Sequence, residues 1–76
     1  MIFGETREVI IGKLGIALLQ VKNERRLHYD DMEKVMDRKE DMIRRYILGD
    51  AEMGIVAFAL ALNAWPELVA KMEVLP

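Results

Sequence analysis

Apolar residues recur along this chain at helical spacing, and short polar breaks divide them into five segments. The first segment carries four apolar residues at i, i+4, i+8 and i+11: Ile10, Leu14, Leu18 and Val21. This spacing predicts an amphipathic helix that begins after Gly4, has Thr6 as its N-cap and ends between residues 23 and 26. Gly12 and Gly15 are poor helix formers, so we expect them to mark a close approach of another element.

Two shorter helices are predicted in the middle of the chain. The first covers Tyr29 to Met36, with acidic residues in its first turn, where they favour the helix dipole. Asp37 and Arg38 break the pattern, and the next helix covers residues 39–48 with Gly49 as its C-terminal cap. The inner faces of these two helices carry seven apolar residues: Met32, Val35, Met36, Met42, Ile43, Tyr46 and Ile47.

The remaining segments predict a helix over residues 51–62, a loop over residues 63–65 and a helix from Pro66 to about Glu73. The residues from Ile55 to Leu62 are all apolar, so this helix would be buried on every side, which a chain this small can hardly achieve alone. No segment alternates with the period of a strand. The predicted fold class is therefore all-α, a compact five-helix bundle.

Composition narrows the class of protein. The chain has 76 residues, 53% of them hydrophobic, so we expect one folded domain over residues 1–76, with residues 1–5 as an N-terminal arm. It has no cysteine, which excludes disulfides and zinc–thiolate sites. No basic segment precedes an apolar run at the start, and no apolar run approaches the roughly 20 residues that span a bilayer. We expect a cytoplasmic protein of the cell that produces it.

The formal net charge of −2 is unevenly distributed. Residues 25–45 hold seven basic and six acidic side chains, whereas residues 46–76 hold four acidic side chains and one lysine. The basic residues of the middle third are a candidate phosphate-facing patch, which the neighbouring acids dilute.

Candidates for catalysis are few. His28 is the only histidine, and with Asp30 and Asp31 it could bind a cation weakly, although a solvated helix cap accounts for the same residues. The carboxylates of Glu40 and Asp41, like those of Asp30 and Asp31, are adjacent in sequence and point to different sides of a helix, so neither pair converges on a substrate. We therefore expect no catalytic residue, no metal and no cofactor.

Methionine and tryptophan each have two interpretations. Met32, Met36 and Met42 could line a promiscuous groove, but they fall at core spacing, where methionine fills gaps. Trp65, beside Pro66, either covers the bottom of a small core or anchors a partner.

Apolar residues also pair across the break within residues 27–49, where Met32 and Met36 precede it and Ile43 and Tyr46 follow. This spacing suits two helices that pack at a steep angle around a tight turn. The segment resembles the helix-turn-helix of the phage repressor and Cro-like (lambda repressor-like) family and follows its pattern without a gap. Seven residues match that pattern in kind: Leu27, Asp30, Asp31, Met32, Met36, Ile43 and Gly49. The resemblance also includes core positions in the preceding helix, and in total it covers most of residues 14–72.

The chain departs from the family pattern at three positions. Glu33 stands where the family packs a small residue between the helices, and a lone buried carboxylate there is costly. Its side chain must therefore reach solvent or one of three basic residues: Lys34, Arg44 and Arg45. Asp37 replaces the turn glycine, although aspartate tolerates left-handed backbone better than most residues. Arg38 replaces an apolar turn residue.

The resemblance implies a small phage- or prophage-type transcriptional regulator that binds operator DNA with the helix 39–48 in the major groove. The implied base contacts are Lys39, Glu40 and Arg44, in which Lys39 or Arg44 pairs with guanine and Glu40 accepts from cytosine. The implied phosphate contacts are Arg25, Arg26, Arg38 and Arg45.

A homodimer is also expected, because the apolar residues outside the core positions exceed what one small core covers. The candidate interface residues are Ile16, Leu19, Phe58, Leu62 and Trp65. The alternative is that the segment Met1–Thr6 folds back over Ile16 and Leu19. A second class of function stays open, a non-enzymatic interaction module on a helix-turn-helix scaffold that binds another regulator or a host protein.

Overall fold

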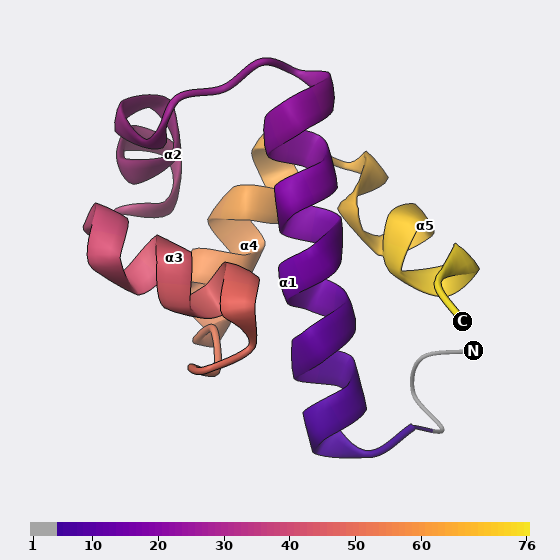
Figure 1. Ribbon diagram of the computed structural model, residues 1–76. Coiled ribbons are helices and arrows are strands. Elements are labelled where there is room, and N and C mark those ends of the chain that lie inside the picture. The colour runs from indigo at the N-terminus through magenta and orange to yellow at the C-terminus, as the bar shows by residue number, and fades with distance from the viewer. Residues whose placement is uncertain (1–4) are drawn as a thin grey trace.

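The computed structural model describes residues 5–76, which form five helices (Figure 1). These are α1 (Arg7–Glu24), α2 (Tyr29–Met36), α3 (Glu40–Leu48), α4 (Ile55–Ala64) and α5 (Glu67–Val74). The predicted all-α class is confirmed for these residues, which include no strand. Most of the predicted N-terminal arm, residues 1–4, lies outside the described part of the chain.

The longest helix, α1, runs through the middle of the bundle (Figure 1). It packs against α3 on one side and α5 on the other, while α4 contacts α2 and α5. The core residues come from all five helices, the loop before α4 and the junction of α4 with α5: Ala17, Leu18, Val21, Met32, Met36, Ile43, Tyr46, Met53, Ala57, Ala61, Trp65, Leu68 and Met72. Met32 and Met36 are fully buried, and Met42 packs against the core, in agreement with their predicted role as core residues.

Caps define where the helices begin and end, close to the predicted residues. The hydroxyl of Thr6 accepts a hydrogen bond from the backbone N–H of Val9, at 3.4 Å, as predicted for the N-cap of α1. Gly49 follows α3 with φ at +77°, and the next N–H, of Asp50, donates to the carbonyl of Arg45 at 2.9 Å. Arg26 adopts the same left-handed backbone after α1, with φ at +55°. Both ends close by the same hydrogen-bonding pattern, so each helix stops at a defined residue.

The crossing of α1 and α3 depends on Gly15. A Cβ atom added at Gly15 would lie 2.4 Å from the carbonyl oxygen of Tyr46 and 2.6 Å from that of Ile47. The two helices therefore meet backbone to backbone, and the predicted close approach is confirmed at this glycine. At Gly12 a Cβ atom would meet nothing within 4 Å, so no element approaches on the side where a side chain would project.

The prediction for the fourth helix is wrong in its bounds and in its burial. The helix begins at Ile55 rather than at residue 51, because Met53 enters the core from a loop and Gly54 provides the N-cap. Only Ala57 and Ala61 of α4 are buried, whereas Ile55 is 80% exposed. The apolar run thus packs one face on the core and presents another to solvent.

Trp65 belongs to the core, where only 2% of its surface is exposed. Of its two interpretations, the core one is correct, and its inclusion among the interface candidates is wrong. Phe58 and Leu62 are partly buried against the same core, while Ile16 and Leu19 are exposed.

Among the described helices, none is by itself both long and apolar enough to cross a membrane. The pair α4 and α5, bent by 102° at its junction, could do so by length and composition alone.

We predict opposite effects of alanine at the two glycines of α1. Gly15→Ala forces its methyl group into the backbone of α3 and should lower the free energy of unfolding by about 1–3 kcal/mol. Gly12→Ala meets open space in a helix interior and should raise it by about 0.5–1 kcal/mol. Urea denaturation followed by circular dichroism measures both. A Gly15→Ala protein as stable as the wild type would show that the two helices are not in backbone contact.

Candidate nucleic-acid interface

The turn between α2 and α3 consists of Asp37, Arg38 and Lys39. Asp37 takes the left-handed conformation, with φ at +54° and ψ at +46°, and its N–H donates to the carbonyl of Glu33 at 2.9 Å. The expectation that aspartate can replace a turn glycine here is confirmed. The turn ends α2 and redirects the chain into α3 within three residues.

The carboxylate of Glu33 is accommodated between α2 and α3 by a hydrogen bond that the sequence did not indicate. Its carboxylate accepts a hydrogen bond from the backbone N–H of Glu40, at 2.6 Å, and its side chain is half-buried. The carboxylate therefore caps the N-terminus of α3, where the helix dipole also favours a negative charge. The predicted basic partners are not used. Seven residues and a turn separate donor from acceptor, so no local pattern could have revealed the cap.

The outer face of α3 carries Arg44, which two neighbours hold in place. Its Nε donates to a carboxylate oxygen of Glu40 at 2.7 Å, and this hydrogen bond raises the pKa of Arg44 above its ordinary value. Its guanidinium lies 4.4 Å from the centre of the Tyr29 ring at the start of α2. The ammonium group of Lys22, from α1, lies 4.7 Å from the same centre. Sequence reasoning missed this stack, which joins three helices through Tyr29.

Two other predicted contacts lie at the turn. Arg38 donates to the carbonyl of Asp37 at 2.8 Å, and Lys39 is exposed at the N-cap of α3. With Glu33, these residues line a shallow depression of about 140 Å³. The structure therefore brings together Arg38 and Lys39 of the turn with Glu40 and Arg44 of α3.

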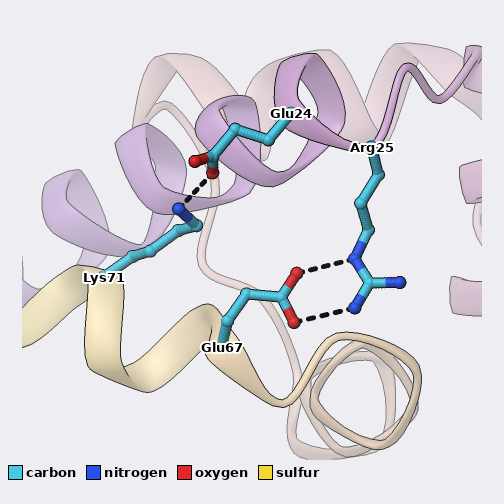
Figure 2. Close-up of polar contacts among 4 residues, drawn as sticks. All are labelled: Glu24, Arg25, Glu67 and Lys71. Atoms are coloured by element: carbon cyan, nitrogen blue, oxygen red, sulfur yellow. Dashed lines mark hydrogen bonds and ion pairs between the residues drawn. The ribbon is translucent and has the colours of Figure 1, made fainter.

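Arg25 is directed away from this surface. Its guanidinium donates two hydrogen bonds to Glu67 of α5, at 2.6 and 2.9 Å, as Figure 2 shows. A second pair, Lys71 with Glu24, lies beside it and joins the same two helices. In this arrangement Arg25 does not lie with the other phosphate candidates, because its guanidinium is directed at a carboxylate of α5.

The two remaining phosphate candidates are exposed. Arg26 lies in the loop after α1, and Arg45 lies on the outer side of α3 next to Arg44. Within residues 5–76, neither forms an ion pair.

The acidic start of α2 is a helix cap. The N–H of His28 donates to a carboxylate oxygen of Asp31 at 2.9 Å, and the histidine is exposed. The part of the chain that the structure describes holds no group of three or more His, Cys, Asp or Glu residues suited to a metal ion. The cap interpretation of these residues is therefore favoured over a cation site.

No family model, curated protein or solved structure matches this chain.

We predict that Glu33→Ala lowers the free energy of unfolding by about 1–2 kcal/mol, because the N-terminus of α3 loses its cap. Glu33→Gln, which keeps an acceptor oxygen, should lose less. Lys34→Ala is the matched control, since Lys34 is exposed on the same helix and should change stability by less than about 0.5 kcal/mol. Chemical denaturation measures all three. Equal stability of the Glu33→Ala and Lys34→Ala proteins would contradict the cap.

The Arg25–Glu67 pair makes a separate pH-dependent prediction. The hydrogen bond from Arg25 lowers the pKa of Glu67 from 4.5 to about 2. A carboxylate with a lowered pKa stabilises the fold above the unfolded value, near 4.5, and loses that contribution as the pH falls towards about 2. The melting temperature of the wild type should therefore exceed that of Glu67→Gln at neutral pH, and the difference should close between these two values.

Glu73→Gln is the control for this titration, because Glu73 is exposed on the same helix. Its difference from the wild type should stay nearly constant over the same pH range. A difference between the wild type and Glu67→Gln that persists at pH 2 would mean that the pair does not form in solution.

Proposed function

We propose that this chain is a small transcriptional regulator of the phage repressor and Cro-like type, which binds operator DNA as a homodimer with α3 in the major groove. The observation that carries this proposal is the unit formed by α2, its three-residue turn and α3. The turn and the Glu33 cap hold α3 by its N-terminus, and Gly49 ends it after nine residues. A short, fixed helix with an exposed charged face is what reading the major groove requires.

Base contacts are assigned to the start and outer face of α3. Arg44 pairs with guanine O6 and N7, and Lys39 lies one turn before it, at the N-cap. Arg38, Arg45 and Arg26 bind phosphates on either side and fix the register. Arg25 is not part of this set, because it points towards Glu67 of α5, on the opposite side of α1 from α3.

The Glu40–Arg44 pair does not prevent DNA binding. Both side chains are about half exposed, at 43% and 56%, and such exposed pairs contribute roughly 0–1 kcal/mol. A bidentate contact between arginine and guanine contributes about 1–3 kcal/mol of discrimination. The base therefore competes successfully for Arg44, while a wrong base leaves Arg44 with Glu40. This pairing favours selective binding over tight binding to any sequence.

An interaction module for another protein is the second candidate, and α4 favours it. That helix contains no charged residue, and Ile55 and Val56 stand 80% and 62% exposed. Such a surface suits an apolar partner. The two functions are distinguished by removing a basic residue from α3, which should weaken binding only if the protein binds DNA.

We predict that the protein binds mixed-sequence duplex DNA near 50 mM salt and releases it steeply as salt rises. Arg45→Ala should weaken this binding about threefold to tenfold and reduce the salt slope by about one unit. Arg7→Ala is the control, because it removes an exposed arginine that lies outside the α2–α3 unit, at the start of α1. Fluorescence anisotropy at several salt concentrations measures both. Absence of binding near 50 mM salt would rule out the DNA function and leave the interaction module.

Sequence selectivity is tested on the best duplex recovered from a random library. Arg44→Ala should lower affinity for that duplex by about 5- to 150-fold, the equivalent of ~1–3 kcal/mol, and should relax the preference for guanine at one position. An unchanged preference would remove Arg44 from the base contacts while leaving the phosphate contacts intact.

A further inference from the structure

A second apolar stripe runs along the solvent side of α1. It consists of Val9, Gly12, Ile16, Leu19 and Asn23, at alternating spacings of three and four residues. We call it the α1 seam. Val9, Ile16 and Leu19 are 44%, 48% and 39% exposed, and the alternation is that of the contact positions in a coiled coil.

The α1 seam is also free of charge. Between Val9 and Asn23, α1 has only two charged residues, Lys13 and Lys22. Lys13 is buried and pairs with Glu5 at 2.6 Å, and Lys22 lies over Tyr29. Both lysines are thus engaged away from the stripe, which leaves it wholly uncharged over its length.

We propose that the α1 seam pairs with the α1 seam of a second copy of this chain, antiparallel, around a two-fold axis near Ile16. This proposal rests on the homodimer within the proposed function and names its surface, but it does not depend on DNA binding.

Gly12 determines the direction of the pairing. A Cβ atom at Gly12 would meet nothing within 4 Å, so the glycine leaves a hollow in the seam. When two seams run antiparallel about Ile16, Leu19 of one copy lies beside Gly12 of the other and fills that hollow, and the symmetry repeats the contact. In parallel pairing, Gly12 of one copy would face Gly12 of the other. The void between them would lack the van der Waals contacts that Leu19 makes in the antiparallel pair.

Charges at the two ends of the seam favour the same direction. Glu8 precedes the seam and Arg26 follows it, and neither forms an ion pair within residues 5–76. Antiparallel pairing brings Glu8 of each copy near Arg26 of the other and opposes the two helix dipoles. Parallel pairing would bring like charges together at both ends.

The size of the seam sets the strength of the dimer. From Val9 to Asn23 it is about 21 Å long at 1.5 Å per residue. Gly49 lies against Gly12, because a Cβ atom added at Gly49 would be 3.8 Å from the Cα of Gly12. The residue before Gly49, Leu48, is 72% exposed. The apolar surface thus continues onto the end of α3. An interface of this extent is at the low end for specific complexes, so the dimer should dissociate on dilution through the micromolar range.

The exposed face of α4 is the competing surface, and it fits a second copy less well. From Ile55 to Asn63 it is only about 12 Å long by the same rise. It therefore provides the control for the experiment.

Sedimentation equilibrium without DNA tests the surface. The wild type should show a monomer–dimer equilibrium, and Ile16→Glu should raise the dissociation constant at least about tenfold, because two carboxylates meet at the axis. Ile55→Glu, which places the same charge on α4, should change it less than about twofold. A wild type that is monomeric at every concentration, or a dimer lost only in Ile55→Glu, would overturn the proposal.

Disulfide cross-linking tests the direction, since the natural chain has no cysteine. In a glutathione buffer, Ile16→Cys should form a homodimeric disulfide, because a residue at the axis faces its own copy. Val9→Cys alone should not, but mixed with Asn23→Cys it should form the heterodimer. Efficient cross-linking of Val9→Cys with itself would show parallel pairing and overturn the proposal. None of these outcomes involves DNA, so they are independent of the Arg44 and Arg45 experiments.

Discussion

The position of α3 depends on one close approach, that of Gly15 to the carbonyl oxygens of Tyr46 and Ile47. No Cβ fits between the two backbones, so the depth at which α3 lies against α1 is fixed by atoms that cannot move independently. The contact also fixes the rotation of α3 about its own axis. Ile43 and Tyr46 turn into the core, and the face with the arginines turns to solvent. The charged surface is thus a consequence of a glycine on another helix.

The two helices that present this surface are too short to be stable alone. They have eight and nine residues, and isolated helices shorter than about 12–15 residues are marginal in water. Their ends therefore matter as much as their packing. Asp37 and Gly49 end them in the left-handed conformation, and Glu33 satisfies the first N–H of α3. A carboxylate that is costly when buried alone becomes favourable when it faces a helix N-terminus.

Periodicity predicted the first three helices to within about one or two residues, because their caps and apolar faces are local features of the sequence. It failed at α4, where Met53 has helical spacing but enters the core from a loop. For the candidate site, the sequence indicated which residues lie on the turn and on α3, but not the contacts that they make. Glu33 with Glu40, Arg25 with Glu67, and Arg44 with Tyr29 are seven, 42 and 15 residues apart, so only the tertiary fold brings them together.

The net charge of −2 describes the whole chain and differs from the balance of charged side chains around α3. Within residues 5–76, five basic residues form ion pairs, and four of these pairs lie outside the α2–α3 unit. Between residues 26 and 45, the basic residues left without such a pair are Arg26, Lys34, Arg38, Lys39 and Arg45. Five acids, Asp30, Asp31, Glu33, Asp37 and Asp41, balance them in number. Asp31 and Glu33, however, accept backbone N–H groups at the starts of α2 and α3, where the partial charge of about +0.5 per helix offsets each carboxylate. Around α3 the charged side chains therefore balance in number, and backbone N–H groups hold two of the carboxylates, so this surface is less acidic than the rest of the chain.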